Sequence, residues 1–249
     1  MIGTLINLVT VMVGGLLGLF IGNRLPERMK TIVVSAIGLM TFLIGVSSAI
    51  KTENALIPLL SLVIGGILGE AINIDKGINT LGDWLKKRFD RPDSQQNFTA
   101  AFVIASLQFC AGPLTVLGAL NDGLSGNFSL LAIKAVLDGF SAIVFASTFG
   151  LGVLFSGATI LVVQGGISLL ARLIKPLLIS VPDANMSAQP RVIELAAVGG
   201  IILMALALNI LDLKRIKVAN LLPALIIAPL LVALLNVAGI PLDFGLGGR

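Results

Sequence analysis

The sequence has no histidine and no tyrosine, one cysteine, and few charged residues. A disulfide framework needs paired cysteines and a zinc-type site needs several Cys or His ligands, so the composition excludes both. We expect no cofactor and no metal. Charged residues make up 12% of the chain, against about 25% in soluble domains. Hydrophobic residues alone make up 56%, above the roughly 45–50% that apolar residues and glycine together reach in soluble domains. This composition excludes a water-soluble body and predicts a lipid-facing chain.

Most charges stand in short clusters between long charge-free runs. A transmembrane helix needs about 20 apolar residues, and most of these runs are long enough. The run 139–171 would exceed the ~30 Å hydrocarbon core as one helix, so we expect a break near Gly150 and Gly152. The sequence therefore predicts an all-α polytopic membrane protein with about eight transmembrane helices, at 2–22, 32–50, 55–73, 98–120, 129–149, 153–173, 192–211 and 219–237.

The cations are unevenly divided between the two sides of this topology. By the positive-inside rule the N-terminus lies outside, because 11 of the 17 cations then fall in inner loops. They are Arg24, Arg28, Lys30, Lys76, Lys86, Lys87, Arg88, Arg91, Lys214, Arg215 and Lys217. No cation precedes the first apolar run, so we expect a retained helix and not a signal peptide. The net charge of +4 is thus topological and predicts no nucleic acid partner.

The longest polar stretch, 75–97, contains an amphipathic segment. Its residues 78–89 place Trp84 and other apolar side chains on one helical stripe, flanked by Lys86, Lys87 and Arg88. Such a helix can lie on the inner leaflet with its cations on anionic head groups. An ordinary cytoplasmic linker is the alternative.

The first and last three predicted helices resemble each other weakly. Segment 35–40 (SAIGLM) is similar to 196–201 (AAVGGI), and 56–64 (LIPLLSLVI) to 221–229 (LLPALIIAP). Each mate lies five helices further on, so the triplets would be inverted, as in many secondary transporters. Chance similarity between apolar helices is the alternative. We expect one membrane domain, 1–249, with a three-helix repeat (1–74), the amphipathic linker (75–97), a central pair of broken helices (98–152) and a second repeat (153–237).

The fifth predicted helix carries two charges, Lys134 and Asp138, four residues apart and therefore on one face. A charge within the bilayer costs several kcal/mol on insertion scales, so we expect the pair to face the protein interior. There Asp138 can bind a cation or proton, while Lys134 either tunes the affinity of Asp138 or binds an anionic group. A structural ion pair near the outer interface is the alternative.

The fourth predicted helix contains Gly112 and Pro113. A proline removes one backbone donor and frees the carbonyl four residues earlier, so we expect the helix to kink or unwind there. Freed backbone at this depth is tolerated where it is buried in protein or lines a wet cavity. A structural kink without function is the alternative.

Polar side chains recur where apolar ones would be less costly. Each can bind a solute or join two helices, and single amides are more often interhelical contacts. As a set converging on the two central helices, they predict a cavity. The candidate residues for binding a solute or ion, besides those above, are Asn7, Gln108, Asn121, Asp122, Gln164 and Asn220.

Several motifs give the chain a family resemblance. They are GTLINLVTVMVGGLLG and NRLPER near the start, GEAINIDKGIN, the segment FCAGPLTVLGALNDGLSGNFSLLAIKAVLDGFSAIVFASTFG, and VANLLPALIIAP near the end. The chain resembles the bacterial YqgA/YdfK-like family of integral membrane proteins over about residues 3–229. Members are generally described as membrane or transport proteins of uncharacterised activity, so the resemblance implies the topology and adds no substrate. The residues within matching motifs are Asn7, Arg24, Pro26, Asn121, Lys134, Asp138 and Asn220.

We expect a secondary transporter or channel-like permease for a small polar or charged solute or ion, with a proton or sodium as candidate coupling ion. It would lie in the bacterial cytoplasmic membrane. The alternative is a non-transporting scaffold or sensor that assembles through glycine-rich helix faces, which would make a homo-oligomer. An enzyme is not expected, since the sequence offers no nucleophile and base to assign.

Overall fold

The computed structural model describes residues 1–22, 26–89, 98–110, 113–171, 173, 178 and 189–238. These ranges contain helices and no strand. The helices are α1 (Ile2–Gly22), α2 (Glu27–Ala49), α3 (Leu56–Ile72), α4 (Ile74–Phe89), α5 (Phe98–Cys110), α6 (Pro113–Ser125), α7 (Ser129–Phe149), α8 (Gly152–Ile160), the π-helix η1 (Leu161–Gly165), α9 (Gly166–Leu169), α11 (Pro190–Ile210), the 3-10 helix η3 (Val218–Leu221) and α12 (Ala224–Val237).

Six stretches among the described residues are long and apolar enough to cross a membrane, and eight if each bent helix pair counts as one span. The predicted all-α polytopic architecture is confirmed. The bent pairs are α3 with α4, at 52°, and α5 with α6, at 60°. The predicted break near Gly150 is also confirmed, because α7 ends there and α8 begins at Gly152. The expectation that both central helices are broken is wrong for the second, since α7 is continuous.

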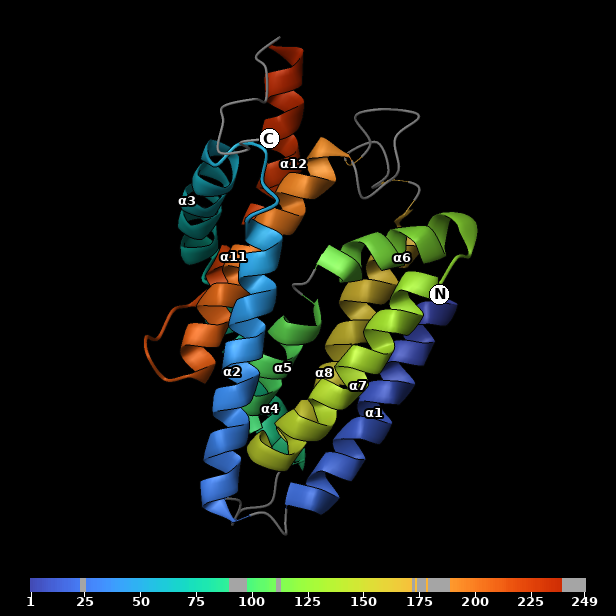
Figure 1. The fold of residues 1–249 in the computed structure, drawn as a ribbon, viewed down its shortest axis with the longest axis vertical. Coiled ribbons are helices and arrows are strands. Elements are labelled where there is room, and N and C mark those ends of the chain that lie inside the picture. Colours follow the sequence, from blue (N-terminus) through green and yellow to red (C-terminus); the bar gives the residue numbers. More distant parts are fainter. Residues whose placement is uncertain are drawn as a thin grey trace.

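The helices form two groups with α5 between them (Figure 1). In one group α1, α7 and α8 run side by side, and α6 lies across their ends near the N-terminus. In the other, α2 packs along α11, and α3 packs against α12. Buried phenylalanines fill the space around α5, where the Phe109 and Phe145 rings meet with centroids 6.0 Å apart. The fold thus places the end of α5 and the beginning of α6 beside α7.

Glycines bring α1 and α7 into close contact. Gly14, Gly18 and Gly22 follow one another every four residues on the α1 face that meets α7. A Cβ at Gly14 or Gly18 would collide with the backbone carbonyl of Gly139 or Ile143. The repeated small residue lets the two backbones approach, which is a common basis of helix association in membranes. The contact holds the α7 charges close to the beginning of α1.

A similar crossing joins α2 to α11. A Cβ on Gly45 would lie 2.7 Å from the carbonyl oxygen of Gly200, and a Cβ on Gly200 would lie 2.5 Å from that of Gly45. The contact is therefore reciprocal. Close backbone approach here leaves the other side of α2 free to face α7.

The predicted amphipathic segment forms α4. It follows α3 after Asn73, whose φ of 63° places it in the left-handed region and turns the chain. One side of α4 packs on α5, where the Asp83 carboxylate accepts a 2.6 Å hydrogen bond from Thr99. On the other side Leu81 and Trp84 are 49% and 60% exposed. The helix is confirmed, while its place on the inner leaflet stays a prediction, as does the division of the chain into repeats.

Candidate functional site

The break between α5 and α6 leaves a backbone carbonyl for other partners. Pro113 has no N–H, so the carbonyl of Phe109, four residues earlier, cannot form its usual helical bond. This carbonyl instead accepts hydrogen bonds from the Thr115 hydroxyl at 3.0 Å and from Lys134 Nζ at 2.8 Å. The helix break therefore provides a negative dipole for a lysine on α7.

Lys134 and Asp138 form an ion pair inside the protein. They are 5% and 8% exposed, and the Lys134 ammonium donates to Asp138 Oδ2. Two buried charges are tolerated only when both are paired and hydrogen-bonded. Lys134 meets this condition through Asp138 and the Phe109 carbonyl, and Asp138 through Lys134 and a further donor on α1.

That donor is Asn7, which lies on α1 and is fully buried. Its Nδ2 donates to Asp138 Oδ2 at 2.9 Å and to Gln164 Oε1 at 3.0 Å. Gln164 belongs to η1, a single π-helical stretch within an otherwise α-helical span. Such π-bulges are rare and occur frequently at functional sites. The predicted residues Asn7, Lys134, Asp138 and Gln164 thus form one network that joins α1, α7 and η1.

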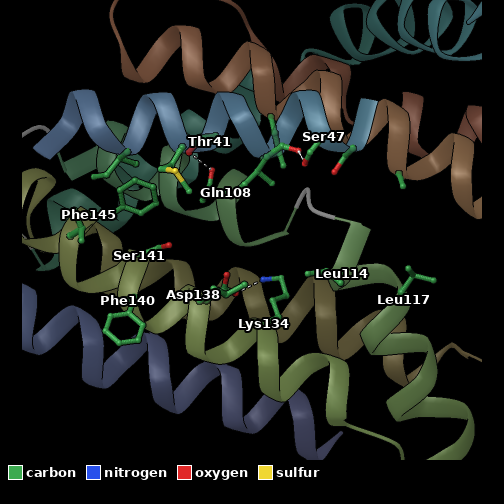
Figure 2. A pocket seen from close by; sticks show the side chains of 18 of the residues that line it. Thr41, Ser47, Gln108, Leu114, Leu117, Lys134, Asp138, Phe140, Ser141 and Phe145 are labelled. Atoms are coloured by element: carbon green, nitrogen blue, oxygen red, sulfur yellow. Dashed lines mark hydrogen bonds and ion pairs between the residues drawn. The ribbon is translucent and has the colours of Figure 1, made fainter. Parts of the chain in front are cut away.

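The ion pair faces a cavity of about 890 Å³ between α2 and α7. Figure 2 shows Lys134, Asp138 and Ser141 along the α7 side, with Thr41 and Gln108 opposite them. The Thr41 hydroxyl lies 3.5 Å from Gln108 Oε1 and donates to it. The rest of the lining is largely apolar, including side chains of α2, α6 and α11. A mostly apolar cavity with a few convergent polar groups is the usual form of a small-molecule site.

Two other predicted residues, Asp122 and Asn121, lie away from this cavity. The buried Asp122 carboxylate accepts from the backbone N–H of Gly3 at 3.1 Å and lies 3.0 Å from the Met1 amino group, so it caps α1. Asn121 is partly buried and accepts at its backbone carbonyl from the Ser125 hydroxyl.

Asn220 also lies outside the network. Its side chain donates to the Glu70 carboxylate at 2.6 Å and accepts from the backbone N–H of Asp75 at 2.7 Å, joining η3 to the α3–α4 turn. Lys217 pairs with the same carboxylate, which raises the pKa of the Lys217 ammonium. Of the remaining predicted residues, Gly112 and the Pro113 side chain lie outside the described part of the structure.

The sequence reasoning missed a buried carboxylate, Glu194 in α11. It accepts hydrogen bonds from the Thr52 hydroxyl at 2.7 Å, the Glu53 N–H at 2.8 Å and the Asn54 N–H at 3.2 Å. Glu194 therefore fixes the α2–α3 loop near the end of the cavity lined by Ser48 and Lys51. It is the one acidic residue in the predicted helix 192–211, and that position was the signal that could have identified it.

Comparisons with known proteins place the chain in a family. The family model of proteins of unknown function named DUF554 matches residues 2–233. The chain belongs to this family. It is 33% identical to the uncharacterized protein YqgA of Escherichia coli (strain K12), over 91% of this chain and 94% of the relative. No solved structure matches the chain significantly.

A second relative is named as a membrane protein. The chain is 29% identical to the uncharacterized membrane protein YdfK of Bacillus subtilis (strain 168), over 96% of this chain and 99% of the relative. The resemblance noted from the motifs is therefore confirmed, and with the apolar helices it identifies a membrane protein in contact with the lipid bilayer. Within the described residues no group of three or more His, Cys, Asp or Glu side chains is arranged to hold a metal ion.

Proposed function

We propose that the protein is a secondary transporter or channel-like permease that moves a small polar or charged solute or ion through the cavity between α2 and α7. The observation that carries the proposal is the position of Lys134 and Asp138, a buried ion pair that lines this cavity. Ionisable residues inside a membrane protein are costly and typically mark solute or ion pathways.

The roles follow from the contacts. Asp138 is the ion-binding carboxylate. Its carboxylate accepts hydrogen bonds from Lys134 and Asn7, and a proton or cation can replace one of these two donors. Lys134 is its neutralising partner. The Phe109 carbonyl holds the ammonium in place when Asp138 is occupied, because it accepts from Lys134 independently. Gln108 and Thr41 offer polar contacts to a solute from the opposite wall.

An inverted repeat is part of the proposal. Its predicted mates contact each other: α2 packs on α11, α3 on α12, and α1 on α8. Asn7 and Gln164, which belong to the first and sixth predicted spans, are hydrogen-bonded to each other. Contact between mates supports a pseudo-two-fold axis through the centre, as in inverted-repeat transporters. The positive-inside bias supports an N-terminus outside the bacterial cytoplasmic membrane.

A scaffold or sensor remains the second candidate, and it predicts a packed centre in which Lys134 and Asp138 touch only each other. The contacts with Phe109 and Asn7 and the adjoining cavity favour the transporter. Assembly through glycine faces is also weakened as an argument, because several of those faces are used within the chain. Gly18 meets α7, and Gly45 meets α11.

We also infer a non-enzymatic role, because Cys110 is the single cysteine and the chain has no histidine to activate it. Loss of a hydrolytic or transfer activity on alkylation of Cys110 would contradict this inference.

Reconstitution tests the proposal. Purified protein in proteoliposomes is screened against amino acids, organic acids, sugars and inorganic ions, with internal dyes that report proton and sodium movement. We expect at least one solute or ion to produce flux above that of empty liposomes. Absence of flux across the panel, from protein that is monodisperse and correctly folded, would favour the scaffold.

A further inference from the structure

A second group of buried polar atoms lies at the beginning of α1, beyond the network that contains Asp138. Within the described structure, no protein group is in hydrogen-bonding position for five of these atoms. They are Thr4 Oγ1, Asn7 Oδ1, Asp122 Oδ1, Gln164 Nε2 and Ser168 Oγ. The five residues are at most 4% exposed. Buried polar atoms almost always have a partner, so a concentration of unpartnered ones requires an explanation.

The five side chains share one neighbourhood. Asp122 accepts from the N–H of Gly3, next to Thr4. A Cβ built on Gly165, the neighbour of Gln164, would lie 3.7 Å from Thr4 Cγ2. A Cβ on Gly123, which follows Asp122, would collide with the Ser168 carbonyl. The residues therefore lie where α1, α6 and the η1–α9 stretch meet.

The contact with Asp138 determines which atoms of Asn7 and Gln164 remain as donor and acceptor. The Asp138 carboxylate accepts from the Asn7 amide group, which fixes that amide so that its Oδ1 is directed elsewhere. The same Asn7 group donates to Gln164 Oε1, which leaves Gln164 Nε2 as a free donor. The group thus presents both acceptors and an N–H donor. A bare metal cation would satisfy the oxygens but not the amide N–H, whereas water both donates and accepts.

The hydroxyls support this reading. Ser156, buried on α8, donates its hydroxyl to the carbonyl of Val153 at 2.6 Å. A serine in a helix interior commonly makes such a bond to its own backbone. Ser168 is also buried yet has no such bond, so its hydroxyl is available to a ligand.

We propose that Thr4, Asn7, Asp122, Gln164 and Ser168 line a narrow water-filled path that connects Asp138 with the membrane face at which α1 begins. Its ligand is a file of hydrogen-bonded water, which supplies or removes the proton of Asp138. The path is separate from the α2–α7 cavity, because none of these five side chains lines that cavity. The ionisable groups along it are Asp122, the Met1 amino group, Asp138 and Lys134.

This inference deepens the proposed function, because it names the proton as the coupling ion, but its test needs no transported solute. In the Cys110→Ala background, Ser168→Cys and Ser61→Cys each provide a single thiol. Ser61 is the matched control, since it is fully buried on α3 and its hydroxyl is also unpartnered. Folded protein is exposed to Ag⁺, a small water-borne ion that binds thiols, then unfolded in detergent and labelled with maleimide.

We expect Ag⁺ to protect the Ser168→Cys thiol from labelling at least tenfold faster than the Ser61→Cys thiol. A second comparison tests whether the path passes Gly165. A side chain on Gly165 would meet Met1 Cε at 3.2 Å as well as Thr4, whereas nothing lies within 4 Å of a Cβ on Gly166. Gly165→Leu should therefore slow protection of the Ser168→Cys thiol severalfold, and Gly166→Leu should leave it unchanged.

Equally slow protection of both thiols would overturn the proposal. A sodium site would overturn it too, and would appear as a higher melting temperature in NaCl than in choline chloride that Thr4→Val abolishes. If Ag⁺ reaches Ser168→Cys but no solute flux is found, the path stands and the proposed transport function does not.

Discussion

Lys134 of α7 donates a 2.8 Å hydrogen bond to the backbone carbonyl of Phe109 in α5. The bond exists because Pro113 has no N–H to offer that carbonyl. A residue that breaks one helix thus creates the acceptor for a buried charge on another.

Restoring the missing N–H should weaken this relationship. In Pro113→Ala a backbone donor competes with Lys134 for the Phe109 carbonyl, so Lys134→Met should cost less stability in that background than in the wild type. Neighbouring residues commonly couple by about 0.5–3 kcal/mol, and a double-mutant cycle on unfolding free energies measures the coupling. Strict additivity would show that the carbonyl does not hold the lysine.

The ion pair should be far more sensitive to losing one partner than both. Lys134→Met leaves the buried Asp138 carboxylate without its counter-charge, which typically costs about 3–5 kcal/mol. The double variant Lys134→Met with Asp138→Asn removes both charges and should recover more than half of that loss. Melting curves of the purified proteins in detergent test this ordering. A single variant as stable as the double would place the pair in contact with bulk water.

Glu194 should stabilise the α2–α3 loop. Glu194→Ala removes the acceptor of the Thr52 hydroxyl and of the Glu53 and Asn54 N–H groups, and should cost on the order of 2 kcal/mol. Glu53→Ala is the control, because the Glu53 side chain is exposed and its N–H keeps the bond. Thermal stability of the two variants is compared. Equal stability would mean that the loop is held by other contacts.

Trp84 gives a direct measure of where α4 lies. It is the single tryptophan of the chain and is 60% exposed, so intrinsic fluorescence reports on this helix. If α4 lies on the inner leaflet, phospholipids brominated near the head group should quench Trp84 strongly, and aqueous iodide weakly. The reverse pattern would identify α4 as a cytoplasmic linker.

The fold was largely predictable because lipid imposes simple rules. Apolar run lengths predict the spans, and the glycines at 150 and 152 predict the α7–α8 break. The functional side chains could be predicted in part. Lys134 and Asp138 are recognisable because charge is expensive within a span. The contact of Asp138 with Asn7 depends on the α1–α7 packing, which brings together residues more than a hundred positions apart.

Other side chains could not be assigned from sequence for the same reason. Asn220 has the same amide group as Asn7, yet it joins η3 to the α3–α4 turn. Asp122 has the same carboxylate as Asp138, yet its Oδ2 caps α1. Only tertiary packing separates these uses. The α2–α7 cavity likewise comes from helix arrangement and leaves no local pattern in the sequence.

In the proposed function, Asp138 binds the coupling ion at the wall of the cavity. The most direct test of this role compares flux of the responding solute or ion in proteoliposomes containing wild-type protein, Asp138→Asn or Glu70→Gln. Glu70 is the matched carboxylate, since it is also paired with a lysine but does not line the cavity. We expect Asp138→Asn to reduce solute-driven proton or sodium flux at least tenfold and Glu70→Gln to leave this flux unchanged. Unchanged flux in folded Asp138→Asn protein would show that Asp138 does not bind the coupling ion.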